Sequence, residues 1–207
     1  MPADAARLTI DLDAIAANYR LLRDMAGGAE TAPVVKADGY GMGAAQTALR
    51  LWAEGARTFY VARLAEGEAL RRALGDRPAA ILVFDGCPAG AAGRLQAAGL
   101  VPVLNSLEQI GAWRGAGGDI EALHVDTGMN RLGLTAAEAG RLAAEGVRPS
   151  LILSHLACAA QPGHALNARQ LGRFCEVRRL FPDARASLSS SGGVFLGPDF
   201  HLDQVRP

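Results

Sequence analysis

The sequence of 207 residues predicts an α/β fold, a (β/α)8 barrel of the TIM type. Short apolar runs alternate with longer segments that have helical periodicity and are rich in Ala, Leu, Glu and Arg. The predicted strands begin roughly 20 to 35 residues apart, which is the length of one strand–helix unit. Repeated units of this kind imply parallel strands with right-handed crossovers, and eight of them favour a barrel.

The individual elements can be placed along the chain in order. The first helix is expected from Leu12 to Met25, with Asp11 or Asp13 as its N-cap. The predicted strands are Ala32–Ala37, Thr58–Ala62, Ala80–Phe84, Val101–Leu104, Glu121–Asp126, Leu151–Ser154, Arg185–Ser189 and Gln204–Arg206. The predicted helices between them include Gly43–Glu54, Ala65–Leu74, Leu107–Gly115, Ala136–Glu145 and Ala165–Leu180.

An open, doubly wound parallel sheet is the alternative fold. Such a sheet would need a phosphate-binding loop after its first strand. The segment Gly39–Gly43 is rich in glycine, but its spacing fits neither nucleotide-binding fingerprint. The barrel is therefore the preferred prediction.

The end of the chain departs from a complete barrel. The last predicted strand begins near Leu202 and the sequence stops at Pro207 without an eighth helix. A typical barrel runs to about 250 residues, and the missing helix would leave apolar barrel surface uncovered. We expect residues 1–207 to form one incomplete barrel domain of a longer chain, or an unusual minimal version of the fold.

Composition excludes several classes of protein. Acidic and basic residues balance at 21 each, which argues against a dedicated nucleic-acid or membrane-surface binder. No apolar run approaches the roughly 18 residues of a membrane span, and Met1–Arg7 has no signal-peptide core. The three cysteines, Cys87, Cys158 and Cys175, are far apart and are expected to be reduced thiols. A cytoplasmic protein is predicted.

Lys36 is the first candidate for chemistry. It is the single lysine among 21 basic residues, and it ends a predicted strand. Arginine cannot replace an amine that must lose its proton or form an imine, because the guanidinium stays protonated. The alternative is a structural lysine that extends to solvent or pairs with Asp38.

Other polar residues stand at the predicted strand ends, where barrel enzymes carry their working residues. Arg131 and Arg206 would need an anionic or ring-nitrogen partner there, unless they are solvated at the surface. The run Ser189–Gly193 can offer hydroxyls and N–H groups to a phosphate, although many such runs are plain turns. His124 and His155 have no acidic or cysteine partner at ligand spacing, so no metal site is predicted.

Several motifs resemble alanine racemases, across the whole chain and in the family's order. Val34–Gly43, VVKADGYGMG, is similar to the segment that carries the cofactor lysine in that family. The further matching segments are Ile10–Ile15 with Asn18, Val125–Gly133 (VDTGMNRLG), Ser154–Ala157, Ser191–Gly193 and Asp203–Pro207.

The resemblance implies a pyridoxal 5'-phosphate cofactor bound as an aldimine to Lys36. Tyr40 and Ser191 match residues that contact the cofactor phosphate. Arg206 matches the arginine that faces the pyridine nitrogen, and His155 matches the histidine that supports this arginine.

The resemblance also implies interconversion of L- and D-alanine, the latter a peptidoglycan precursor. Arg131 matches an arginine near the cofactor's phenolic oxygen and the substrate carboxylate, and the freed Lys36 amine can act as the base on one face. The second acid/base of the family is a tyrosine from a C-terminal β domain, which the partner subunit of a homodimer supplies. That domain has no counterpart here, so this chain alone is expected to bind the cofactor but to racemise poorly.

Two residues depart from the family pattern. His124 stands where the family often has a carbamylated lysine whose negative charge steadies the arginine that matches Arg131. Arg131 is hypothesised to be steadied instead by Asp126, by a bound anion or by neutral His124. Ser190 replaces the usual asparagine.

Two further functions stay open on sequence grounds. One is a non-catalytic pyridoxal-phosphate carrier, which the missing β domain favours. The other is a different enzyme on the same barrel, such as a serine racemase, a D-threonine aldolase-like enzyme or a decarboxylase.

Overall fold

The computed structural model, which describes residues 6–207, contains eight parallel strands in one sheet. Their order is β1-β8-β7-β6-β5-β4-β3-β2. The strands are β1 (Glu30–Thr31), β2 (Thr58–Val61), β3 (Ala80–Val83), β4 (Val101–Leu104), β5 (Ala122–His124), β6 (Leu151–Leu153), β7 (Arg185–Ser190) and β8 (Gln204–Arg206). An isolated bridge between Val34 and Tyr60 joins the chain after β1 to β2 and closes the barrel. The predicted barrel is confirmed.

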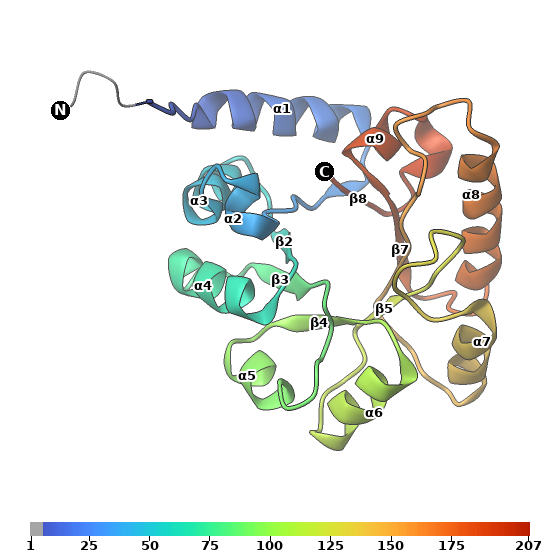
Figure 1. Cartoon of the computed structure of the whole chain (residues 1–207). Coiled ribbons are helices and arrows are strands. Elements are labelled where there is room, and N and C mark those ends of the chain that lie inside the picture. The colour runs from blue at the N-terminus through green and yellow to red at the C-terminus, as the bar shows by residue number, and fades with distance from the viewer. Residues whose placement is uncertain (1–5) are drawn as a thin grey trace.

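Helices surround the strands (Figure 1). They are α1 (Leu12–Met25), α2 (Lys36–Tyr40), α3 (Ala44–Ala53), α4 (Leu64–Leu74), α5 (Ala92–Ala97), α6 (Leu107–Gly115), α7 (Ala136–Ala144), α8 (Ala165–Arg178), α9 (Ser191–Val194) and the 3-10 turn η1 (Pro198–Phe200). Asp11 is the N-cap of α1, because its side chain accepts hydrogen bonds from Asp13 N and Ala14 N. In the part of the chain that the structure describes, no helix is long and apolar enough to cross a membrane.

The apolar residues form two main layers, one inside the barrel and one between the strands and the helices. Alternation along β2 shows the division: Tyr60 belongs to the inner cluster, whereas Phe59 and Val61 belong to the outer one. The inner cluster fills the barrel, so the strands enclose packed side chains and no pore. Functional groups are therefore confined to the ends of the strands.

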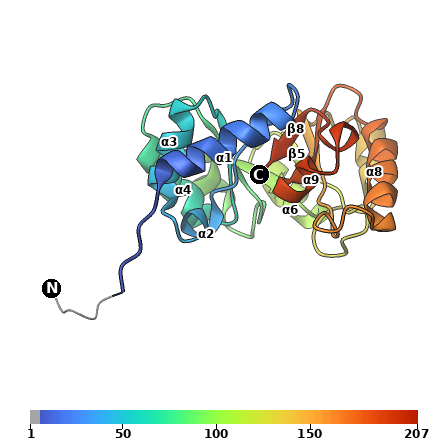
Figure 2. The same cartoon turned by 90° about the horizontal axis from the view of Figure 1, so that it is seen from above.

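Earlier segments of the chain cover the outward face of β8. Val205 packs in a small buried cluster with Ala26, which directly follows α1, and with Val194 of α9. Figure 2 shows α1 crossing from α3 to α9, and both contacts are present in the structure. The expectation that apolar barrel surface would be left bare is thus wrong at this strand.

The first strand is shorter than the predicted range of residues 32–37. The assigned strand ends at Thr31, although hydrogen bonds to the β8 segment continue from Ala32 N to Val205 O and from Val34 N to Pro207 O. The chain stays extended to the bridge at Val34, and α2 then begins at Lys36. The short helices α2, α5 and α9 were not predicted.

Candidate active site

The carboxyl ends of the strands bring most of the predicted residues to one end of the barrel. Lys36 follows β1, His124 ends β5, His155 follows β6, Ser191 follows β7 and Arg206 ends β8. Because all eight strands are parallel, these positions share one rim. The candidate site is built from this rim.

The segment that follows Lys36 is a left-handed turn. Ala37, Asp38 and Gly39 have φ/ψ values of 50°/49°, 52°/49° and 63°/37°, and Tyr40 has φ 57°. Each non-glycine residue in this conformation costs roughly 1–2 kcal/mol. Such strain is kept only where the surroundings impose it, and it is typical of functional sites.

Contacts from α3 and α4 hold the turn in place. Ala37 N donates to Glu66 Oε1 at 2.8 Å, and Asp38 Oδ1 accepts from Ala44 N at 2.8 Å. Gly39 lies so close to α3 that a Cβ atom there would come within 3.2 Å of Ala44 N. The turn therefore depends on tertiary contacts and on the absence of a side chain at Gly39.

The Lys36 amine lies between aromatic rings. Its Nζ atom is 5.9 Å from the ring centroid of Tyr40 and 5.8 Å from that of Phe84. Phe84 is itself stacked on Tyr60, with centroids 4.9 Å apart. Lys36 takes part in no salt bridge among the described residues, and the Asp38 carboxylate bonds to α3 instead. The structural alternative of a Lys36–Asp38 pair is therefore not observed.

Arg206 is a buried cation without an anionic partner in the described part of the chain. Its side chain is 3 % exposed, donates to Ser187 Oγ and to Ser154 O (2.6 Å), and lies with Cζ 5.8 Å from the Tyr60 ring centroid. Burial lowers the pKa of the guanidinium. A buried guanidinium that contacts only neutral groups is well placed to bind an acceptor supplied by a ligand. The surface-solvation alternative is excluded for Arg206.

His155 lies in the field of the site's cations. Burial, followed by the charges of Arg206, Arg131 and Lys36, lowers the pKa of His155 to about 4, so the imidazole is neutral at pH 7. The His155 carbonyl accepts from Gln170 Nε2 at 2.9 Å. The observed hydrogen-bond partners of Arg206 are the serines described above, and His155 is not among them.

His124 pairs with a residue that sequence reasoning missed. Its Nδ1 atom lies 2.8 Å from Asn105 Oδ1, and both side chains are buried. Burial, reinforced by the charge of Arg206, lowers the pKa of His124 to about 3. Asn105 directly follows β4, and this position at a strand end was the signal that could have identified it.

Arg131 lies on a loop with a fixed backbone. One oxygen of Asp126, Oδ1, accepts from the backbone N–H groups of residues 128–130, and a bridge between Val125 and Leu134 closes the loop. Asp126 thus holds the loop, whereas the Arg131 side chain is exposed and has no hydrogen-bond or ion-pair partner among residues 6–207. The hypothesised Asp126–Arg131 pair is not observed.

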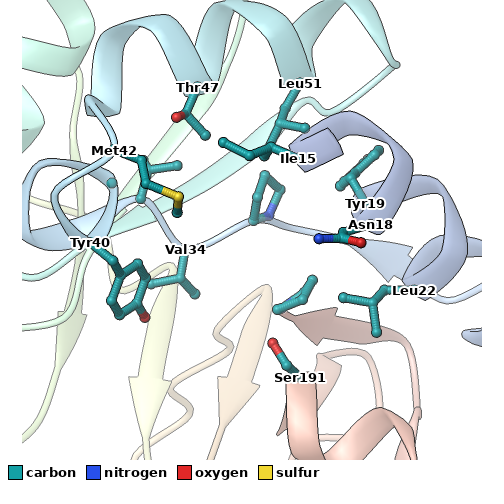
Figure 3. Close-up of a pocket in the computed structure, with 14 residues that line it drawn as sticks. Ile15, Asn18, Tyr19, Leu22, Val34, Tyr40, Met42, Thr47, Leu51 and Ser191 are labelled. Atoms are coloured by element: carbon teal, nitrogen blue, oxygen red, sulfur yellow. The ribbon is translucent and has the colours of Figure 1, made fainter. Parts of the chain in front are cut away.

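Tyr40 and Ser191 line one pocket of about 260 Å³ between α1, α3 and the ends of β1 and β8. Figure 3 shows Tyr40 and Ser191 toward the lower part of the view, with Leu22 of α1 near Ser191 and Ile15 of α1 farther from it. The lining residues are Ile15, Asn18, Tyr19, Leu22, Pro33, Val34, Val35, Gly39, Tyr40, Met42, Thr47, Leu51, Ser191 and Pro207. Lys36, His155 and Arg206 are not among its lining residues, but Lys36 Nζ lies 5.9 Å from the ring centroid of Tyr40, so the pocket adjoins the amine.

No group of three or more His, Cys, Asp or Glu side chains among the described residues could hold a metal ion. The site offers one amine, two arginines and hydroxyl groups at the end of a parallel barrel. These features define a TIM-barrel protein whose site suits an anionic small molecule beside a primary amine.

Residues 10–207 match the family described as "Alanine racemase, N-terminal domain", and the chain belongs to this family. It is 49 % identical to an alanine racemase of Methylobacterium nodulans and 47 % identical to a catabolic alanine racemase of Mesorhizobium japonicum. These matches cover 98 % and 99 % of this chain but only 56 % of each relative.

Solved structures agree with this assignment. An alanine racemase from Bartonella henselae, described with covalently bound pyridoxal phosphate, is similar with a TM-score of 0.88 at 38 % identity. A biosynthetic alanine racemase from Pseudomonas aeruginosa gives 0.86 at 35 %. Each match covers 96 % of this chain, and 58 % and 57 % of the respective solved chains. The chain therefore spans rather more than half the length of these proteins.

Proposed function

We propose that residues 1–207 form the cofactor-binding barrel of an alanine racemase, with pyridoxal 5'-phosphate linked covalently to Lys36. The observation that carries the proposal is the buried Arg206, which has no carboxylate partner among the described residues and shares the strand-end rim with the only lysine. When bound, the cofactor supplies the electron sink that acidifies the Cα–H of an amino acid.

The residues present fit such a cofactor. The Lys36 amine, free of ion pairs in the described chain, is available for covalent attachment and can then carry a proton on one face of the substrate. Arg206 is fixed by two hydrogen bonds and would face the ring nitrogen. Tyr40 and Ser191 offer hydroxyls to the phosphate from their shared pocket.

Two further residues, Arg131 and His155, would set the charge that the site presents to a substrate. Arg131, exposed on a loop with a fixed backbone, would bind the substrate carboxylate. His155, whose pKa is lowered to about 4, would stay neutral beside the cations and add no further positive charge. Together they leave a positive rim for an amino acid and its cofactor phosphate.

We further propose that this chain alone racemises poorly. Racemisation needs a second acid/base on the face opposite Lys36. Tyr19 and Tyr60 are buried, their hydroxyls donate to Thr31 O and Gln204 Oε1, and burial raises both pKa values. Neither is free for that role, so the second group would come from another part of a longer, homodimeric, cytoplasmic enzyme that makes D-alanine.

The experiment is cofactor attachment. Pyridoxal phosphate is added to the chain, the linkage is reduced with borohydride, and the modified peptide is identified by mass spectrometry. We expect the label on Lys36, loss of the label in Lys36→Arg, and L- to D-alanine turnover at least 100-fold lower than that of a longer racemase chain. A folded chain that takes up no label would overturn the cofactor proposal, and full turnover by residues 1–207 would overturn the second.

A further inference from the structure

Two acceptors hold the buried Arg206 guanidinium, and they belong to different kinds of structure. Ser187 Oγ lies within β7 and its hydroxyl donates to Gln204 O at 2.7 Å, so the register of the sheet places it. Ser154 O, the second acceptor, comes after the end of β6. Ser154 N still donates to Ser187 O, but the chain then leaves the sheet. The position of Ser154 O therefore depends on what holds the residues that follow it.

Gln170 holds the backbone that follows Ser154. Its side chain is fully buried (0 % exposed) on α8, a helix that packs against β7 (Figure 1). The Nε2 atom of Gln170 donates to His155 O at 2.9 Å, and its Oε1 atom accepts from Ala157 N at 2.8 Å. Among the described residues, these are the only hydrogen bonds to the backbone of residues 155–157.

The orientation of the Gln170 amide is unambiguous. A backbone N–H can only donate and a backbone carbonyl can only accept, so Ala157 N must face Oε1 and His155 O must face Nε2. The amide thus pairs with a segment outside the sheet as the peptide group of a neighbouring strand would. Removing it would leave both backbone groups without their hydrogen bonds, which is costly for buried groups.

A second path leads from Gln170 to Ser154 through Thr127, a buried residue that follows β5. Gln170 Nε2 also donates to Thr127 Oγ1 at 3.3 Å, and Thr127 Oγ1 lies 2.8 Å from Ser154 Oγ. The Thr127 carbonyl is held from the same helix, because Arg173 Nη1 donates to it at 3.0 Å. The backbone and the hydroxyl of Ser154 are therefore both connected to one amide.

We propose that Gln170 is a positioning residue of the site, whose amide fixes residues 154–157 and, through Ser154 O, sets the position of the Arg206 guanidinium. A guanidinium donates in a rigid planar fork, so movement of one acceptor turns the whole group. Gln170 acts through Ser154 and not on a ligand. The inference rests on the proposed function only for what Arg206 faces.

Asn167 offers a matched control on the same helix, three residues before Gln170. It is also a buried amide (2 % exposed), and its Nδ2 atom donates to Cys158 O at 3.2 Å and to Gln161 O at 2.9 Å. These contacts hold a later part of the same loop and include neither acceptor of Arg206. Substitution at either amide should lower stability, whereas only the loss of Gln170 should move Arg206.

The test follows the Arg206 side-chain N–H groups by ¹H–¹⁵N NMR in the chain without cofactor, with signals assigned by their loss in Arg206→Lys. Buried, hydrogen-bonded groups exchange slowly with water. Exchange at Arg206 should be at least threefold faster in Gln170→Leu, which has no polar group, than in the unaltered chain. Asn167→Leu should leave this rate unchanged, although both variants should unfold at lower urea concentrations.

An unchanged Arg206 rate in folded Gln170→Leu, or an equal rise in Asn167→Leu, would overturn the positioning role. Thr127→Val decides the matter if Gln170→Leu does not fold, because it removes only the hydroxyl path to Ser154. It should raise the Arg206 rate by a smaller factor, and a rate equal to that of the unaltered chain would then overturn the inference. Since no cofactor is present, these outcomes are independent of whether Lys36 takes the label.

Discussion

The two sides of the barrel rim are constructed differently. On the β1 side, backbone conformation places Lys36 and Tyr40, through a left-handed turn that contains three non-glycine residues. On the β4–β6 side, hydrogen bonds between side chains hold the polar residues in position. Asn105 fixes His124 there, and Thr127 Oγ1 lies 2.8 Å from Ser154 Oγ.

Because of this difference, the β1 side and the β4–β6 side should tolerate different substitutions. The turn stores strain, so an added Cβ or a lost tertiary contact should be costly there. The β4–β6 side contains buried polar groups that are paired with each other. Removing or protonating one partner leaves the other unsatisfied and lowers the free energy of unfolding. Three measurements on folding stability test this contrast, from the largest expected effect to the smallest.

The largest effect of a single group is expected at Gly39. Its φ is +63°, and a Cβ atom at this position would lie 3.2 Å from Ala44 N, so both features oppose a side chain. Gly39→Ala should lower the free energy of unfolding by about 2 kcal/mol or more, because conformational strain and a backbone clash add together. Urea unfolding curves measure this directly.

Gly41 is the matched control, since it has φ +85° but nothing within 4 Å of a Cβ. Gly41→Ala should cost only the conformational strain, about 1 kcal/mol. If Gly39→Ala and Gly41→Ala lowered the free energy of unfolding equally, close packing of Gly39 against α3 would not be what holds the turn in place.

The next effect is pH dependence on the opposite side of the rim. The pKa of His124 is lowered to about 3 and that of His155 to about 4, against an ordinary value of 6.5. The unfolded chain therefore takes up protons first as the pH falls. The two neutral histidines contribute fully to the free energy of unfolding above about pH 6.5. This contribution falls as the pH is lowered, by about 1.4 kcal/mol for each histidine at pH 5.5.

Urea midpoints between pH 7.5 and pH 5.5 give the measurement. His124→Gln should remove about half of the slope. An unaltered slope in His124→Gln would mean that this imidazole is not held neutral in the folded protein.

Sequence reasoning located the parts of the molecule that depend on local patterns. The bounds of α1, α6, β4 and β8 match the predicted ranges, because periodicity and capping signals are local. Lys36 was singled out by its uniqueness and by its predicted place at a strand end, and in the structure it follows β1 and begins α2.

The rest depends on contacts between distant residues. Ala37 and Asp38 carry no sequence signal for a left-handed turn, and Ala37 is held by Glu66, 29 residues away. Asn105 meets His124 across 19 residues, and Ser187 meets Arg206 across 19. Such pairs follow from strand register, which periodicity alone does not supply.

The smallest effect is expected at Asp38, whose Oδ1 atom accepts from Ala44 N at the start of α3. Gly43, the N-cap of α3, has no side chain to cap the helix, so Asp38 takes this role from the neighbouring turn. Asp38→Ala should cost about 1 kcal/mol, the usual loss for a removed cap, and should be read in the same urea assay.

Asp38→Asn separates the hydrogen bond from the charge, because the amide keeps an acceptor oxygen. We expect Asp38→Asn to be within about 0.5 kcal/mol of the unaltered chain. A loss as large as that of Asp38→Ala would mean that the negative charge at the helix N-terminus matters more than the hydrogen bond. The β1 side would then depend on electrostatics as well as on backbone conformation, and the contrast with the histidine side would be correspondingly weaker.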